Sequence, residues 1–274
     1  MKLRTIKLFL LLTFLNPIIA SATDWCADAG LEAGYYMDEA SGNLDDCSSN
    51  DNDMVPTATP PGNYASAGQF GNAFDFTESN DDGFSSTDIA AMTNITTLSV
   101  GAWTAPDSDG ATTGGIVNKW DGSDGWQFRL VTGAGPNEFT LRYQWTGGVG
   151  AWQTTTTPVV FTPAWQHLAV TYNAAGGSGV DPVFYYNGVS QSLTETNTPS
   201  LSPDDDTGGE PCIGITGDGS GTGTASEFDG DIDEVFVYNG GAVLDSTDIN
   251  DIMDNGLTSV AAATAVTDTG GGFI

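Results

Sequence analysis

The stretch Phe228-Asp-Gly-Asp-Ile-Asp-Glu-Val-Phe-Val-Tyr238 has the composition of a β-strand that closes a domain. Because side chains alternate between the two faces of a strand, Val235 and Val237 face one way and Phe236 faces the other. The acidic residues come first, at Asp229, Asp231, Asp233 and Glu234. An acidic beginning and an apolar end predict two roles, closing a core and holding a hard cation. The acids themselves are expected to remain in water.

Three other stretches accompany this strand in order along the chain. They are Gly34-Tyr-Tyr-Met-Asp-Glu-Ala-Ser-Gly-Asn43, Gly68-Gln-Phe-Gly-Asn-Ala-Phe-Asp-Phe76, and Trp165-Gln-His-Leu-Ala-Val-Thr-Tyr172 with Tyr185-Tyr-Asn-Gly188 after it. Together the four resemble the laminin-G-like domains of the concanavalin A-like lectin/glucanase superfamily, from about Leu31 to about Asp254. The resemblance implies an all-β fold, a two-sheet antiparallel β-sandwich (jelly roll), with one short C-terminal helix. We expect Ser246 or Thr247 to cap that helix.

The chain divides into three predicted parts. Residues 1–22 combine a basic start, a short apolar run and an Ala-x-Ala end, which is the pattern of a secretory signal peptide. Residues 23–257 form the predicted laminin-G-like domain, a size that suits one all-β unit. Residues 258–274 are rich in Ala, Thr and Gly and are expected to form a flexible tail or linker. The protein is therefore expected to be secreted or held at the cell surface.

The charge of the chain is strongly acidic, with 36 Asp and Glu residues against 6 Lys and Arg residues. Three of the bases, Lys2, Arg4 and Lys7, lie in the predicted signal peptide, which leaves 3 bases against 36 acids and a net charge of −33. Such a surface repels nucleic acid and anionic membranes. It suits a medium that is rich in salt or calcium, where screening relieves self-repulsion.

Three cysteines are present in the chain. Cys26 and Cys47 bracket the first predicted strand, and in an exported protein an intrachain disulfide between them is expected. Cys212 would then remain as a buried free thiol. Three cysteines allow three pairings, and the sequence alone cannot choose among them.

Carboxylates at the first turn and in the closing strand form the candidate metal site. In the superfamily that the chain resembles, a calcium ion often lies where the first turn meets the last strand. The positions that match this arrangement are Asp38, Glu39 and Asp233, whose oxygen atoms suit Ca²⁺. The alternative is that the first-turn Asp only caps the turn. Looser candidates are Asp45, Asp51 and Asp53.

All three bases of the mature chain lie between residues 119 and 142. Residues 126–130 and 141–145 alternate apolar and polar side chains and predict a hairpin, with its apolar face in the core and both arginines on the other face. We expect a ligand patch there, which contacts a sugar hydroxyl, a uronic acid or a sulfate group beside a stacking tryptophan. Its candidate residues are Lys119, Trp120, Arg129, Arg142, Gln144 and Trp152. The alternative is that the three bases form ordinary ion pairs with nearby acids on a solvated sheet.

The sequence offers no convincing catalytic constellation. His167 is the only histidine, so it lacks partners for a zinc site or a triad and is expected to be structural. The run Glu227-Phe-Asp-Gly-Asp-Ile-Asp233 is similar to the Glu-x-Asp-x-Glu strand of glucanases on this fold, but it lacks the final Glu and occupies the closing strand.

We therefore interpret the chain as an exported, non-catalytic binding module for an extracellular carbohydrate or a cell-surface protein, with a structural calcium ion. Two alternatives stay open. One is a polysaccharide-degrading hydrolase or lyase on the same fold. The other is a structural subunit of an extracellular appendage or matrix, which would associate with itself.

Overall fold

The computed structural model describes residues 22–57, 63–77, 82–86, 90–107, 113–131, 137–155, 159–161, 164–217 and 226–258. The predicted signal peptide, apart from its last residue, lies outside the described residues and stays a prediction. The same holds for the predicted tail, apart from Thr258.

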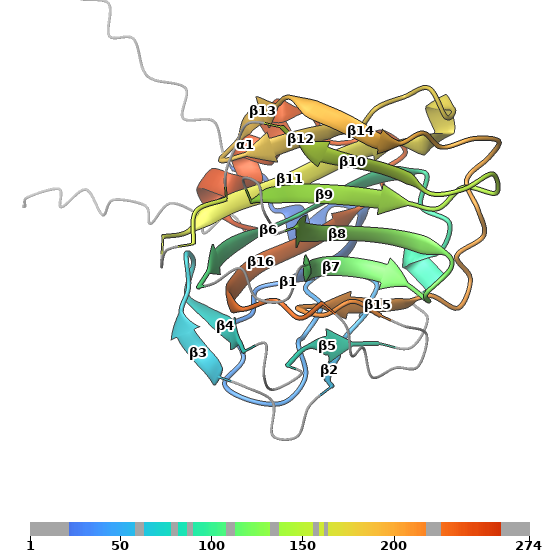
Figure 1. The fold of residues 1–274 in the computed structure, drawn as a ribbon. Helices are drawn as coiled ribbons and strands as arrows, with labels where there is room; N and C mark the ends of the chain where they lie inside the picture. The colour runs from blue at the N-terminus through green and yellow to red at the C-terminus, as the bar shows by residue number, and fades with distance from the viewer. Residues whose placement is uncertain are drawn as a thin grey trace, which may run out of the picture.

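Two antiparallel sheets of eight strands lie face to face and form a sandwich, as the sequence predicts (Figure 1). The first, here called the β16 sheet, runs in the order β13 (Val189–Gln191), β12 (Val183–Tyr186), β11 (Gln166–Asn173), β6 (Thr97–Pro106), β16 (Gly230–Tyr238), β4 (Asn72–Phe76) and β3 (Asn63–Ala67), with β1 (Leu31–Tyr35) beside β16. The second, here called the β8 sheet, runs in the order β14 (Leu193–Asn197), β10 (Gly150–Thr154), β9 (Glu138–Tyr143), β8 (Gly125–Val131), β7 (Thr113–Trp120), β15 (Glu210–Ile213), β5 (Phe84–Ser85) and β2 (Val55–Pro56). The helical elements of the described chain are the short 3-10 turns η1 (Trp25–Ala27), η3 (Ala90–Met92) and η4 (Ala174–Gly176) and the C-terminal helix α1 (Ser246–Asn255).

Strand β16 joins the two halves of its sheet. It pairs with β6 on one side, while on the other side β4 pairs with its first half and β1 with its second half. A β-bulge at Asp233 and Glu234 separates the halves, and Glu234 has a φ of 50° there. The extra residue of a bulge bends the strand, so one strand can serve two partners on the same side. The expectation that the acids of this strand remain in water is wrong for Asp233 and Glu234, because the bulge places both side chains in the interior.

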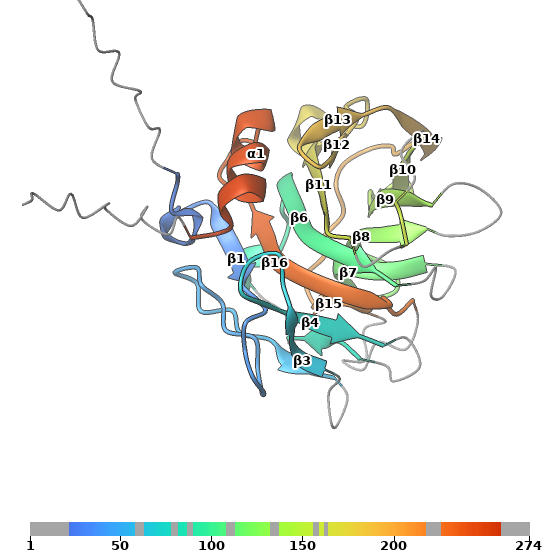
Figure 2. The same ribbon diagram turned by 90° about the vertical axis from the view of Figure 1, so that its left-hand side faces the viewer.

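The apolar half of β16 is buried on both faces. Val235 and Val237 belong to the main core between the two sheets. Phe236 belongs to a smaller apolar cluster with Ile249 and Ile252 of α1. Figure 2 shows α1 on the side of the β16 sheet that faces away from the β8 sheet. The predicted alternation is therefore confirmed, and each face has its own apolar partner.

The cap of α1 differs from the expectation. Asp245, rather than Ser246 or Thr247, is the N-cap residue, and its carboxylate accepts hydrogen bonds from the backbone N–H groups of Thr247 and Asp248. The side chain of Asp248 accepts the N–H of Asp245 in return, which completes a capping box. A carboxylate also interacts favourably with the positive end of the helix dipole, which a hydroxyl cannot match.

The cysteines follow the expected pattern. Cys26 and Cys47 form a disulfide with a Cα–Cα distance of 5.4 Å, and Cys212 is buried and lies outside that disulfide. The disulfide joins η1 to the loop that follows β1. Within the described ranges, no helix has the length and apolar character needed to cross a membrane.

Candidate ligand-binding groove

The outer face of the β8 sheet carries both arginines. The aromatic and aliphatic side chains of β8 and β9 enter the main core, so Arg129 and Arg142 alternate onto the opposite face. The register sets Arg129 opposite Thr140 and Gln127 opposite Arg142. Residues that are directly opposite in an antiparallel pair share a face, so these four side chains form one patch. The sequence prediction for the hairpin is confirmed at this point.

A pocket of about 290 Å³ opens over this patch. We call it the arginine groove. Four neighbouring strands, β8, β9, β10 and β14, contribute to it. Its polar lining consists of Arg129, Thr140, Arg142, Gln153, Thr196 and Asn197. No acidic residue lines it in the part of the chain that the structure describes.

The two arginines lack carboxylate partners. Within the described residues, neither Arg129 nor Arg142 forms an ion pair. Nη1 of Arg142 donates to Oε1 of Gln127 at 3.4 Å, and its Cζ lies 5.3 Å from the centre of the Trp120 ring. Burial, with a further contribution from the charge of Arg142, lowers the pKa of Arg129 to about 10. Both guanidinium groups therefore stay positive at neutral pH.

Two hydrogen-bonding groups of the groove are buried without a partner among the described residues. They are Nε of Arg129 and the hydroxyl of Thr140, a residue that is only 5% exposed. Buried polar groups are normally paired with protein or with an ordered molecule. The groove therefore offers two positive charges to a bound molecule, and two buried polar groups beside them have no described partner.

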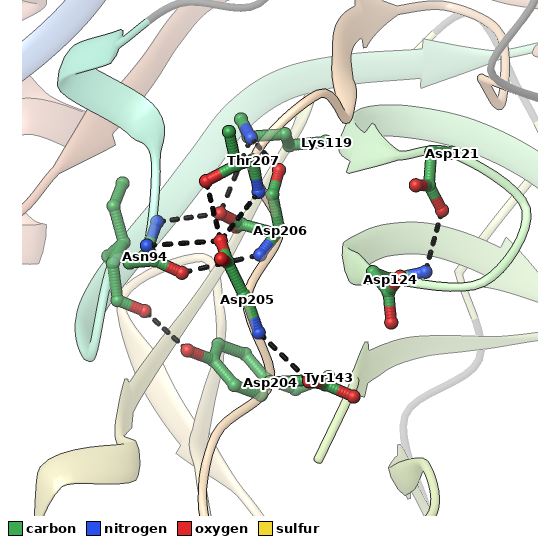
Figure 3. Close-up of polar contacts among 10 residues, drawn as sticks. Asn94, Lys119, Asp121, Asp124, Tyr143, Asp204, Asp205, Asp206 and Thr207 are labelled. Carbon is green, nitrogen blue, oxygen red and sulfur yellow. Dashed lines mark hydrogen bonds and ion pairs between the residues drawn. The ribbon is translucent and has the colours of Figure 1, made fainter. Parts of the chain in front are cut away.

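Lys119 lies close in sequence but faces the other way. It stands opposite Trp126 in the register of β7 and β8, so it shares the core-facing side of the sheet. The side chain is 0% exposed, and its Nζ donates to the backbone oxygen of Asp206 at 2.5 Å and lies 3.4 Å from Oδ1 of Asp206 (Figure 3). Asp206 Oδ1 also accepts the N–H of Asn94 at 2.6 Å. This ion pair holds residues 204–207 against β7 and does not enter the groove.

Of the other three predicted patch residues, Trp152 lines the groove, Trp120 contacts its Arg142, and Gln144 is not among the described lining residues. Trp120 is 7% exposed and lies under Arg142. Trp152 borders the groove but is only 1% exposed, and its Nε1 donates to Asp181 Oδ1 at 3.0 Å. Gln144 donates from Nε2 to the backbone oxygen of Trp145 at 3.0 Å. Neither tryptophan presents an open ring face to the groove.

Several groove residues were not among the sequence candidates. Thr140 could have been found, because it lies two residues before Arg142 in an alternating strand and so shares its face. Gln153 shares that face because it stands opposite Thr140. Thr196 and Asn197 carry no pattern of their own, and only the pairing of β14 with β10 brings them to the groove.

The predicted calcium ligands lie at the junction of β1, β4 and β16 but do not form one group. Oδ1 of Asp38 accepts the backbone N–H of Asn72 at 2.5 Å, and Oδ2 of Asp233 accepts the backbone N–H of Phe70 at 2.9 Å. Glu39 turns instead to the N–H of Asp45, at 3.0 Å. In the described segments, no three His, Cys, Asp or Glu side chains are grouped so that they could hold a metal ion.

A second pocket, of about 460 Å³, lies at this junction. Its lining includes the carboxylates of Asp38 and Glu234. Burial raises the pKa of Asp233 to about 8 and that of Glu234 to about 7, and Oδ1 of Asp233 is buried without a partner among the described residues. Carboxylate oxygens are donors that Ca²⁺ prefers, but among the described residues only two carboxylates line the pocket.

The structure brings together no catalytic histidine site within its described residues. His167 is fully buried between the rings of Trp103 and Phe236, and burial lowers its pKa to about 3, so it is neutral at ordinary pH. This agrees with the structural role expected from the sequence. The acidic residues of β16 belong to the other sheet and do not line the groove.

The sandwich, with one outer face covered by α1 and a polar groove on the other, defines a lectin-like β-sandwich domain. A laminin-G family model, described as the concanavalin A-like lectin/glucanases superfamily, matches residues 78–250. This match covers more than half of the chain, and the chain belongs to that superfamily. A comparison with curated proteins found no match.

Solved structures show the same fold at low sequence identity. Domain 4 of AbnA, an extracellular arabinanase from Geobacillus stearothermophilus, solved with arabinotriose, is 19% identical, with a TM-score of 0.53 over 82% of this chain and 98% of that chain. The receptor binding domain of botulinum neurotoxin C/D mosaic serotype is 13% identical, with a TM-score of 0.57 over 82% of this chain and 51% of that chain. The botulinum neurotoxin serotype D ligand binding domain in complex with N-acetylneuraminic acid is 13% identical, with a TM-score of 0.54 over 82% of this chain and 50% of that chain. This chain thus spans about half of the neurotoxin chains, and the likeness concerns the fold.

Proposed function

We propose that this protein is an exported, non-catalytic module that binds carbohydrate in the arginine groove. The observation that carries the proposal is a pocket across four strands with unpaired polar groups and without a carboxylate in its described lining. Glycoside hydrolysis generally needs two carboxylates that flank the scissile bond, and this lining supplies neither.

Two further observations support a glycan as partner and an extracellular location. Similar domains were solved in complex with arabinotriose and with N-acetylneuraminic acid, which are both sugars. The Cys26–Cys47 disulfide is typical of proteins that leave the reducing cytosol. A role outside the cell also agrees with the signal peptide that the sequence predicts.

The test is a glycan-array screen of the chain without residues 1–22, followed by calorimetric titration of each bound glycan. We expect saturable binding that the Thr140→Val variant weakens by about tenfold, because valine keeps the shape but removes the free hydroxyl. The exposed Ser190 on β13 provides the control substitution Ser190→Ala, which should bind like the wild type. Binding to no glycan would contradict the proposal.

The same samples discriminate the two alternatives. Release of reducing ends or unsaturated products from a bound polysaccharide would favour the hydrolase or lyase. Ordered filaments in electron micrographs, without glycan binding, would favour the structural subunit.

We also propose that Ca²⁺ binds weakly in the pocket that Asp38 and Glu234 line. Two carboxylates in one pocket suit a low-affinity extracellular site, with a dissociation constant of about 0.1–1 mM. Millimolar CaCl₂ should therefore raise the melting temperature of the wild type, and the Asp38→Asn variant should lose most of this rise. MgCl₂ at the same concentration is the control. An unchanged melting temperature in calcium would remove the metal from the proposal.

A further inference from the structure

The positive charge of the domain is concentrated in one place. Only three bases follow residue 22, and they are Lys119, Arg129 and Arg142. Lys119 is paired with Asp206 in the interior. The two arginines lie on adjacent strands and line the same groove. Although the chain holds 36 acids, no described carboxylate pairs with either arginine.

Two cations held side by side without an anion are unfavourable. Like charges repel, and partial burial removes some of the water that would relieve this repulsion. The lowered pKa of Arg129 has these two causes, burial first and the charge of Arg142 second. An anion that contacted both guanidinium groups would remove the repulsion.

We infer that the arginine groove binds an acidic sugar, and that Arg129 and Arg142 hold its carboxylate or sulfate group. This inference rests on the proposed function and names the class of glycan. A guanidinium group donates two parallel hydrogen bonds to an oxyanion, which makes arginine the side chain suited to this task. The hydroxyl of Thr140, directly opposite Arg129 and without a described partner, lies beside the same place.

The surroundings of the tryptophans favour a charged ligand over a neutral one. A sugar ring that is held by stacking needs an exposed aromatic face. The Trp120 ring lies under Arg142, and Trp152 is buried in the core. Charge and hydrogen bonds are therefore the means of recognition that the described lining offers. Asn197 is placed to contact the ring hydroxyls, while Nε2 of Gln153 already donates to Oε2 of Glu138.

The experiment compares three oligosaccharides by calorimetric titration of the chain without residues 1–22. They are an oligouronate, the same oligosaccharide with its carboxylates reduced to hydroxymethyl groups, and a sulfated oligosaccharide of similar length. We expect the oligouronate, the sulfated sugar or both to bind, and the carboxyl-reduced sugar to bind at least tenfold more weakly than the oligouronate if the carboxylate is the group held. Binding of the sulfated sugar alone identifies sulfate as the source of the oxyanion.

Substitutions then locate the contact. Arg129→Gln and Arg142→Gln should each weaken acidic-sugar binding by at least tenfold, and Arg129→Lys should recover part of it because the charge returns without the fork. The control is Ser190→Asp on β13 of the β16 sheet. It lowers the net charge by one unit, as each Arg→Gln substitution does, and should leave binding unchanged. Melting curves confirm that each variant is folded.

The outcomes separate this inference from the proposed function. If neutral sugars bind as tightly as acidic ones, the acidic-sugar inference is wrong and the carbohydrate-binding function stands. If both Arg→Gln variants bind acidic sugars like the wild type, the inference is also wrong, and the Thr140→Val variant then decides whether the sugar binds in the arginine groove. If no sugar of any kind binds, the proposed function fails, and this inference fails with it.

Discussion

Asp233 and Glu234 are neighbours at the bulge of β16, and both carboxyl groups are buried. Each accepts a backbone hydrogen bond, from Phe70 N–H at 2.9 Å and from Leu257 N–H at 2.6 Å. These hydrogen bonds do not offset the effect of burial, which raises the pKa of Asp233 to about 8 and the pKa of Glu234 to about 7. The folded protein thus holds these protons more tightly than the unfolded chain does. The free energy of unfolding therefore falls as the pH rises from the unfolded pKa values of 3.8 and 4.5, and it levels off above the folded values of about 8 and about 7.

The pH dependence of unfolding tests this burial. Without calcium, the free energy of unfolding in urea should be lower at pH 8 than at pH 5, by an amount on the order of a few kcal/mol. Asp233→Asn should reduce the difference, because the amide carries no charge that burial could penalise. The exposed Asp254 of α1 provides the control, Asp254→Asn. An equal pH dependence in the Asp233 variant and the wild type would contradict the assignment.

The buried pair of Lys119 and Asp206 makes a second prediction for single residues. Asp206→Asn removes the negative charge that faces a fully buried ammonium group. Leaving one member of a buried pair uncompensated generally costs about 3–5 kcal/mol, and the backbone oxygen of Asp206 that still contacts Nζ should keep the loss near the lower value. Chemical denaturation measures it. A loss below about 1 kcal/mol would show that the pair does not stabilise the fold.

At the scale of elements, α1 and the bulged β16 decide which face can bind a ligand. The apolar half of β16 contacts the β8 sheet on one face and α1 on the other, so this part of the β16 sheet has no open face. The outer face of the β8 sheet has no covering helix in the described chain, as Figure 2 shows. The groove therefore lies there, between strands whose alternation directs polar side chains outward.

The disulfide acts on two elements that are close in sequence. It joins η1 to the loop after β1 across a separation of 21 residues. On the loop-entropy model, closing a loop of this size contributes about 3 kcal/mol. The double variant Cys26→Ser/Cys47→Ser should lose about this amount in denaturant unfolding. A reducing agent should destabilise the wild type by the same amount as the double substitution does, and it should leave the double variant unchanged. If the reducing agent destabilises the double variant more than the wild type, the effect arises from Cys212 and not from this disulfide.

At the scale of the whole molecule, self-repulsion among the acids opposes folding. The full chain carries a net charge of −30 at pH 7 and has a calculated isoelectric point of about 4.1. Salt shortens the range of this repulsion, to roughly 10 Å at 0.1 M. Raising NaCl from about 0.05 M to about 1 M at pH 7 should therefore raise the melting temperature. At a pH near 4 the net charge is close to zero, and the increase should largely disappear. A fall in melting temperature with salt at pH 7 would contradict this account.

The same charge bears on ligand binding. A net negative protein repels an acidic glycan at long range, while the arginines attract it within the groove. Salt weakens the long-range repulsion more than the contact in a partly buried site. An acidic sugar should therefore remain bound at salt concentrations that abolish binding to an open basic surface.

The sequence alone predicted the features that depend on residues close together in the chain. Alternation with period two placed Arg129 and Arg142 on one face, and the family motifs identified the sandwich. The positions of Cys26 and Cys47 around one strand favoured their pairing, but the choice among three pairings came only from the structure, where their Cα atoms lie 5.4 Å apart. The alternation follows from local geometry, because a strand reverses its side chains at every residue.

Tertiary structure decided what each of these residues contacts. The register of β7 against β8 turned Lys119 inward, and the loop that carries Asp206 reached it from 87 positions away in the chain. The same packing buried Asp233 and brought Asn197 to the groove. It left the arginines without a described carboxylate, although acids are abundant. Burial and charge pairing depend on distances between segments far apart in sequence, and no local pattern encodes those distances.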